Sequence, residues 1–202
     1  MAIEEDEHGT YIMNSKDLRA VQHVENFVKM GVDSLKIEGR TKTHFYVART
    51  VQTYRKAIDD AVAGRPFDMR LMDDLESLSN RGYTEGFYRR HPHGAFQTYE
   101  HGNSRMTRHQ FVGEVLEDDG EWLRIDVKNR FEVGDQLELM SPQGNHSFVL
   151  SELIDRHGQP GQVAPGTGHV VRIPRPEGFN GDPQFSLLLR WLPELAQAAV
   201  PA

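Results

Sequence analysis

The chain has 202 residues, a formal net charge of −7 and no cysteine. This length suits one domain or two small ones, and the lack of thiols excludes disulfides, thiolate zinc sites and iron–sulfur ligation by this chain. No apolar run reaches the length of a membrane span, and the acidic start is unlike a secretory signal. We therefore expect a cytoplasmic protein with no membrane attachment.

The charge differs between the two halves of the chain. Residues 1–108 carry 16 Lys and Arg against 16 Asp and Glu, whereas residues 109–202 carry 7 against 14. An acidic half is a poor clamp for nucleic acid, because such a clamp neutralises phosphates. The segment 83–108 is basic and rich in aromatic side chains that could stack on bases, although a solvated linker is an alternative interpretation. Its candidate RNA-binding residues are Arg89, Arg90, Arg105 and Arg108.

The first third of the chain predicts two β-then-α units. Residues 11–13 form a short apolar strand, and Asn14 supplies the cap of a helix that has Asp17 in its first turn and ends at Gly31. After a second strand, Thr41 or Thr43 caps a longer helix, and Asp68 caps a third. The apolar stripe predicted for the long helix consists of Val47, Val51, Tyr54, Ile58 and Ala61.

Alternating strands and helices with short connections indicate a parallel sheet with right-handed crossovers. A closed α/β barrel needs eight strands and typically about 250 residues, so two strands are too few. We therefore predict that residues 1–82 form the last two β/α units of an incomplete TIM-type α/β barrel. The missing N-terminal barrel half would be its partner, and the unclosed sheet would favour self-association.

The second strand of this region has an unusual charge pattern. Leu35 and Ile37 would face one side of the sheet, while Lys36, Glu38 and Arg40 face the other. A parallel strand covered on both faces should be apolar throughout, so a charged face indicates a site at the barrel mouth. We hypothesise that these three charged residues are catalytic; the alternative is a buried structural ion pair.

From residue 109 onward the pattern is entirely that of β-strands. Short alternating segments separated by turn residues predict about six strands that close into a small β-barrel over 109–192. The pattern resembles the second domain of translation GTPases, which is usually a docking module. Residues 193–202 are predicted to fray. The fold class is therefore α/β followed by all-β.

Four stretches, 11–18, 35–40, 54–58 and 81–87, resemble the C-terminal portion of the collagenase-like bacterial peptidase family, number thirty-two in class U. The resemblance implies an α/β barrel followed by a small β-barrel. It also implies activity on tRNA, because members of the family hydroxylate the wobble uridine with prephenate and an implicated iron–sulfur cluster. The upstream strands and cysteines of the family have no counterpart here. We therefore expect an inactive C-terminal fragment without the cluster.

The resemblance also implies roles for the residues at the barrel mouth. Arg40 or Lys16 could hold a carboxylate such as those of prephenate through charge-assisted hydrogen bonds. Glu38 could orient Lys36 or move a proton if burial raised its pKa. The barrel mouth would contain Asn14, Ser15 and Lys16 for substrate binding together with Lys36, Glu38 and Arg40.

Three other functions compete with tRNA hydroxylation. A peptidase is suggested by the family name, but no His-Glu-x-x-His or Gly-x-Ser-x-Gly motif occurs. The nearest approach to a metal site, His91-Pro92-His93, lacks helical spacing, so we predict no metal site. A Schiff-base enzyme would use a desolvated Lys36. A non-catalytic module would bind RNA or protein through the basic segment and the β-barrel.

Overall fold

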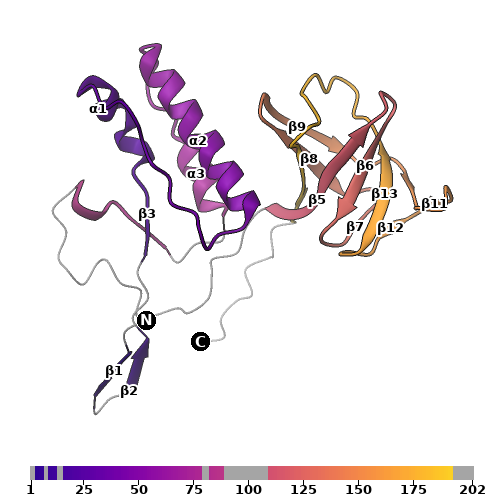
Figure 1. Cartoon of the computed structure of the whole chain (residues 1–202), viewed down its shortest axis with the longest axis horizontal. Helices are drawn as coiled ribbons and strands as arrows, with labels where there is room; N and C mark the ends of the chain where they lie inside the picture. The colour runs from indigo at the N-terminus through magenta and orange to yellow at the C-terminus, as the bar shows by residue number, and fades with distance from the viewer. Residues whose placement is uncertain (1–2, 7–8, 13–15, 79–81, 89–108, 193–202) are drawn as a thin grey trace, which may run out of the picture. The chain divides into compact units, whose positions relative to one another are not determined.

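The computed structural model describes residues 3–6, 9–12, 16–78, 82–88 and 109–192 (Figure 1). The chain folds as two compact units, 1–107 and 108–202. Within the described residues, no helix is both long and apolar enough to span a lipid bilayer.

The first unit combines short strands with three helices. The strands β1 and β2 form an antiparallel hairpin, whereas β3 and β4 pair in parallel. Helix α2 contacts both α1 and α3, and Figure 1 shows these helices side by side. The elements are β1 (Ile3–Asp6), β2 (Gly9–Ile12), β3 (Asp17–Leu18), η1 (Val21–His23), α1 (Val24–Lys29), α2 (His44–Val62), α3 (Arg70–Glu76), β4 (Tyr83–Thr84) and η2 (Gly86–Tyr88).

The parallel pair β3–β4 replaces the predicted start of the first helix. The backbone N–H of Asp17 donates to the carbonyl of Gly82 at 3.0 Å, and that of Arg19 donates to the carbonyl of Thr84 at 2.9 Å. Because these amide groups are engaged in a ladder, the first helical turn begins only at Val21. The predicted first turn at Asp17 is therefore wrong, whereas the predicted stop at Gly31 is confirmed by its φ of 75°.

The predicted strand at the charged segment is also wrong. Residues 32–39 form neither strand nor helix, although Leu35 and Ile37 are half-buried and Lys36 and Glu38 are exposed. The alternation of side chains therefore exists without a ladder, because among the described residues no strand pairs with this segment. Of the two expected parallel strands, the first overlaps β2, which pairs antiparallel with β1, and the second is absent. The parallel pair of this unit is instead β3–β4, and the TIM-type barrel stays a prediction.

Helix α2 begins as the sequence predicts but buries a different face. The Oγ1 of Thr43 accepts a hydrogen bond from the backbone N–H of Tyr46 at 3.2 Å, which confirms this cap. The predicted apolar stripe is only partly confirmed: Val51 is exposed, and the other four members are half-buried. Packing against the neighbouring helices overrides the apolar pattern. The buried residues of α2 are Phe45, Arg49, Thr50, Thr53, Ala57 and Asp60.

Asp60 fastens the C-terminal end of α2 to the chain that follows. Its buried carboxylate accepts hydrogen bonds from Nζ of Lys56 and, at 2.7 Å, from Nε of Arg65. The backbone N–H of Arg65 donates to the carbonyl of Asp60 at 2.8 Å. The hydrogen bond from Lys56, and to a smaller extent that from Arg65, lowers the pKa of Asp60 below its ordinary value. The ionised carboxylate is therefore the stable form.

The second unit is an antiparallel β structure. Its largest sheet has the order β11-β10-β13-β6-β5-β14-β8-β9, and β7 pairs separately with β12. The strands are β5 (His109–Asp118), β6 (Trp122–Val127), β7 (Phe131–Glu132), β8 (Gln136–Ser141), β9 (Gly144–Val149), β10 (Leu153–Ile154), β11 (Pro160–Gly161), β12 (Val163–Ala164), β13 (His169–Pro174) and β14 (Leu187–Trp191).

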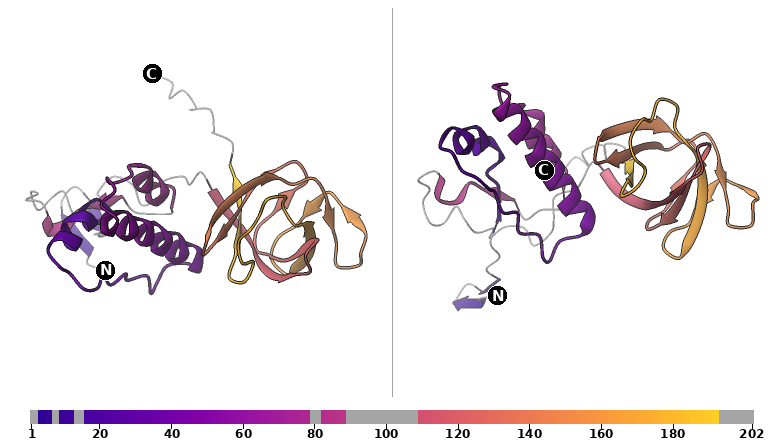
Figure 2. Two further views of the ribbon diagram at one scale, coloured as in Figure 1. Left: turned by 90° about the horizontal axis from the view of Figure 1, so that it is seen from above. Right: turned by 45° about the horizontal axis from the view of Figure 1, so that its top comes forward.

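The strands of the second unit curl around one apolar core (Figure 2). The prediction of an all-β region is confirmed, but the predicted six-stranded closed barrel is wrong. The main sheet has eight strands, and β9 and β11 each have a single neighbour in it, so its ladder does not close. The core of fully buried side chains includes Val112, Leu123, Ile125, Val127, Phe131, Leu137, Leu139, Ile173 and Leu188.

Gly113 allows β5 and β6 to approach closely. A Cβ atom at this position would lie 2.5 Å from Cγ2 of Ile125 and 3.0 Å from the carbonyl oxygen of Asp126. The backbone oxygen is fixed by the ladder, since Gly113 pairs with Val127 and Glu114 with Asp126. A side chain at 113 therefore has no space on this face of the sheet.

We predict that Asp60→Asn destabilises the first unit by about 1–3 kcal/mol, because it weakens two hydrogen bonds to a buried carboxylate. The matched control is Asp59→Asn, which removes an exposed pair with Arg55. The pKa of Asp60 is lowered in the folded state. The stabilisation that its carboxylate gives to the fold is therefore complete above the ordinary carboxyl pKa and is lost as the pH falls below it. Urea unfolding, followed by helical circular dichroism, measures the free energy of unfolding of each variant. An equal loss of stability in both variants at neutral pH would contradict the prediction.

We predict that Gly113→Ala destabilises the second unit by about 1–3 kcal/mol through overpacking. Trp122 and Trp191, the two tryptophans of the chain, both lie in this unit, so tryptophan fluorescence during unfolding reports on it. Gly161→Ala is the control, because its Cβ would meet only the end of the Leu153 side chain within 3 Å. If Gly113→Ala lowers the free energy of unfolding no more than Gly161→Ala does, β5 and β6 do not depend on a glycine at position 113.

Candidate functional site

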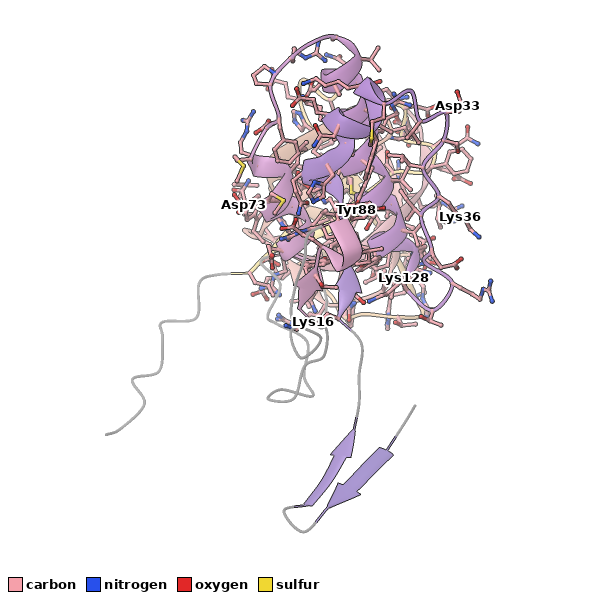
Figure 3. All side chains as sticks on the ribbon, turned by 90° about the vertical axis from the view of Figure 1, so that its left-hand side faces the viewer. Lys16, Asp33, Lys36, Asp73, Tyr88 and Lys128 are labelled. Atoms are coloured by element: carbon pink, nitrogen blue, oxygen red, sulfur yellow. The ribbon has the colours of Figure 1, made fainter. Side chains whose placement is uncertain are left out.

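The charged row of Lys36, Glu38 and Arg40 forms a connected cluster at the surface of the first unit. Nζ of Lys36 lies 3.7 Å from Oε2 of Glu38, and Nε of Arg40 lies 3.8 Å from Oε1 of the same carboxylate. The three side chains are 85%, 58% and 85% exposed, respectively. Figure 3 shows Lys36 pointing away from the ribbon. The sequence therefore predicts correctly that they share a face.

The exposure of this row corrects two interpretations. A buried structural ion pair is wrong, because all three side chains are open to solvent. A Schiff-base nucleophile at Lys36 needs a desolvated ammonium group, and an 85% exposed side chain does not provide one. Lys36 and Arg40 place two cations on either side of the Glu38 carboxylate. This arrangement is able to bind an anion.

The other predicted site residues are only partly described. Lys16 directly precedes β3, is half-buried and lies beside Gly82. The remaining predicted residues lie outside the described part of the chain: Asn14, Ser15, Arg89, Arg90, Arg105 and Arg108.

A polar cluster joins β3 to the start of α2. Nζ of Lys42 donates to Oδ2 of Asp17 at 2.6 Å and also lies 4.5 Å from the ring centre of Tyr46. The hydroxyl of Tyr46 lies 3.5 Å from the same Asp17 oxygen. Lys42 is thus held by a carboxylate and by an aromatic face, so it is less available for binding an anion than Lys36 or Arg40.

A second polar cluster lies on β4. The Arg19 guanidinium packs 4.5 Å from the ring centre of Tyr83 and donates to Oε1 of Glu76 at 2.5 Å. The hydroxyl of Tyr83 donates to the carbonyl of Leu75 at 2.8 Å. These contacts tie β3, β4 and α3 together, so we interpret this cluster as structural.

Burial raises the pKa of three tyrosines in this unit, Tyr46, Tyr54 and Tyr83, above the ordinary tyrosine value. The nearby Asp17 carboxylate raises the pKa of Tyr46 further, and neighbouring Tyr46 adds to the shift of Tyr83. All three are therefore stable as neutral phenols over the physiological pH range.

His23, the last residue of η1, and Glu85, which follows β4, form a histidine–carboxylate pair. Nε2 of His23 lies 2.8 Å from Oε2 of Glu85, and both side chains are largely buried. The ring centres of His23 and Phe27 both lie near Tyr88, at 5.3 Å. A carboxylate that fixes one ring nitrogen sets the orientation of the imidazole, which is the arrangement of a histidine that binds a ligand or transfers a proton.

Sequence reasoning did not identify this pair. The two residues are 62 positions apart, and only the pairing of β3 with β4 brings them together. One local signal was present: His23 and Phe27 are four positions apart, a spacing that places two rings on one helical face. Within the described ranges, no group of three or more His, Asp or Glu side chains could hold a metal ion.

The second unit uses its cations internally. All seven Lys and Arg residues between 109 and 202 lie in the described ranges, and six of them form ion pairs with Asp or Glu. The seventh, Arg156, donates to His157. Phosphate binding by this unit would have to break these pairs, so its surface is poorly suited to RNA. The six are Arg124, Lys128, Arg130, Arg172, Arg175 and Arg190.

Comparison with protein families places both units in one family. The model of peptidase family U32 matches residues 2–98, and the model of the peptidase family U32 C-terminal domain matches residues 107–185. The chain belongs to peptidase family U32. The predicted resemblance of four stretches of the sequence to this peptidase family is thereby confirmed.

Two similar relatives of this U32 chain carry the name tRNA hydroxylation protein P. The protein from Escherichia coli is 57% identical over 187 residues, covering 92% of this chain and 41% of the relative. The protein from Haemophilus influenzae is 54% identical over 188 residues, with 92% and 40% covered. The chain therefore spans about two fifths of the length of these relatives.

Among solved structures, the C-terminal domain of a Geobacillus thermoleovorans protein named for the same U32 family matches part of the chain. The TM-score is 0.36 at 20% identity, and the match covers 40% of this chain and 91% of the other.

The buried tyrosines predict the alkaline behaviour of the first unit. Because their pKa values are raised in the folded state, their stabilisation is present below the ordinary tyrosine pKa of about 10 and is lost as the pH rises above it. In an absorbance titration of the six tyrosines, we expect one group to ionise normally and another only together with loss of helical circular dichroism. A single ionisation step with the helical signal unchanged would contradict this.

Proposed function

We propose that this chain forms part of a protein that hydroxylates tRNA. The observation that carries the proposal is the identity of 57% and 54%, over 92% of the chain, to two proteins named for tRNA hydroxylation. The whole reaction, its substrate and its partners are proposed from these relatives, because the chain spans only about two fifths of their length. The family resemblance suggests the wobble uridine as the position that is modified.

We propose that the charged row binds the carboxylates of prephenate. Lys36 and Arg40 flank Glu38, and the row is turned away from the half-buried Leu35 and Ile37. A guanidinium group suits this role, because it can bind a carboxylate through two parallel hydrogen bonds. Glu38 would keep the two cations apart and aligned while no substrate is bound. A cavity that closes over the row would strengthen these contacts by excluding water.

The iron–sulfur cluster of the family does not fit the residues of this chain. Such clusters are held mainly by cysteine thiolates, and the 202 residues contain none. The roles proposed for this chain are therefore limited to binding and positioning. In the parent protein, redox chemistry would use groups outside these residues.

The alternatives are less well supported. A hydrolytic peptidase site would need a nucleophile with its base or a metal group, and the described residues contain no such metal group. The candidate His91-Pro92-His93 lies outside the described residues. A binding module that holds RNA through residues 109–192 is disfavoured by the internal pairing of six of the seven cations in this range.

A chimera tests the proposed function. In tRNA hydroxylation protein P of Escherichia coli, the matching 187-residue segment is exchanged for this chain, and the chimera is expressed in cells that lack the native protein. We expect nucleoside mass spectrometry to show that tRNA hydroxylation is restored, whereas this chain expressed alone restores nothing. A chimera that accumulates in folded form but restores no hydroxylation would refute the proposal.

The same chimera tests the charged row. Arg40→Ala is expected to lower hydroxylation about tenfold or more, because it removes a charge-assisted contact to the substrate carboxylate. Arg70→Ala is the matched control, since Arg70 is an equally exposed arginine that pairs with a carboxylate, that of Asp68, elsewhere in the unit. Equal activity of the two variants would remove Arg40 from the site.

A further inference from the structure

The ring of Tyr88 is held firmly although half of its surface faces solvent. The residue is 51% exposed, yet its ring centre lies 5.3 Å from those of both Phe27 and His23. The planes are tilted by 55° and 37°, so the neighbouring rings limit its rotation without covering it. Figure 3 looks onto the face of the first unit that carries Tyr88.

Several elements build the support beneath this ring. His23 ends η1 and is fixed by Glu85, which follows β4, at 2.8 Å. Phe27 lies on α1, with its ring centre 6.4 Å from that of His23. The backbone N–H of Tyr88 donates to the carbonyl of Glu85 at 3.2 Å. The same carboxylate residue thus positions both the imidazole and the tyrosine.

The sequence that follows Tyr88 favours a polyanionic partner. Arg89 and Arg90 follow it directly in the sequence, and no carboxylate occurs between Glu85 and Glu100. Among the described residues 109–192, by contrast, six of the seven Lys and Arg residues are already paired with carboxylates. Proteins that bind single-stranded nucleic acid combine an exposed aromatic face with Lys and Arg residues, and here the exposed ring is followed in the sequence by two arginines.

We propose that Tyr88 stacks on an unpaired base of RNA, with Phe27 and the His23–Glu85 pair as its positioning residues. The inference rests on the proposed function for the identity of the RNA, which would be tRNA with its unpaired anticodon bases. Stacking needs only the aromatic face, so the tyrosine hydroxyl is not required for binding. The site supplies affinity and orientation and takes no part in bond making or breaking.

The test measures RNA binding by the full 202-residue chain. The probes are a fluorescein-labelled anticodon stem-loop RNA and a fully paired RNA duplex of the same length, followed by fluorescence anisotropy. Tyr88→Ala is expected to weaken binding of the stem-loop by about 5- to 150-fold, the range found when one base–aromatic stack is removed. Tyr88→Phe and Tyr88→Trp should bind within about twofold of the unsubstituted chain, because both keep a stacking face.

The control is Phe185→Ala, which removes an aromatic side chain that is 78% exposed in the second unit and is expected to leave binding unchanged. Circular dichroism verifies that each variant is folded. Equal binding by Tyr88→Ala and the unsubstituted chain would overturn the inference, as would equal losses for stem-loop and duplex, or no binding at all. If this surface binds a protein instead of RNA, Tyr88→Ala and the unsubstituted chain will bind the RNA equally.

Failure of the stacking proposal can be distinguished from failure of the proposed function in tRNA hydroxylation. The chimera that carries Tyr88→Phe should hydroxylate tRNA as well as the unsubstituted chimera, whereas the one with Tyr88→Ala should hydroxylate it less. If the unsubstituted chimera restores hydroxylation and Tyr88→Ala changes neither activity nor binding, the stacking proposal alone is wrong. If no chimera is active but stem-loop binding depends on the ring, the tRNA hydroxylation proposal alone is wrong.

Discussion

The two backbone hydrogen bonds between β3 and β4 determine what the first unit can do. They join Asp17 to Gly82 and Arg19 to Thr84, residues separated by 65 positions along the chain. The contact of Arg19 with Tyr83 and the His23–Glu85 pair both follow from this one parallel register. A shift of the register by one residue would turn these side chains to opposite faces and would separate every pair.

The two units handle charge in different ways. In the described part of the second unit, 109–192, six of seven cations pair with a carboxylate of the same unit. The exposed pairs among them add little stability, roughly 0–1 kcal/mol each, but they remove positive potential from the surface. In the first unit, Lys36 and Arg40 share a single carboxylate at distances near 4 Å, which leaves them able to exchange it for a ligand. These two cations are thus less tightly engaged than the six paired cations of 109–192, which lie within 3.0 Å of a carboxylate oxygen.

Local chemistry was predictable from the sequence, whereas features that depend on distant partners were not. The cap of α2 was narrowed to Thr41 or Thr43, and Gly31 was identified as a stop, because a cap and a left-handed stop depend on a few neighbouring residues. The shared face of the charged row also followed from alternation alone. Its exposure did not, since a single sequence does not reveal which segment covers a face. The buried side of α2 was misplaced for the same reason, and the pairing of His23 with Glu85 depends on a contact 62 residues away.

The first and last strands of the second unit end side by side. Trp191 of β14 is the ladder partner of His109 of β5, and their ring centres are 3.9 Å apart. A unit whose entry and exit points coincide can be joined to another protein through a short connection without disturbing its interior. Residues 109–192 are therefore suited to exchange between proteins as one segment, because both junctions fall at the same edge of the sheet.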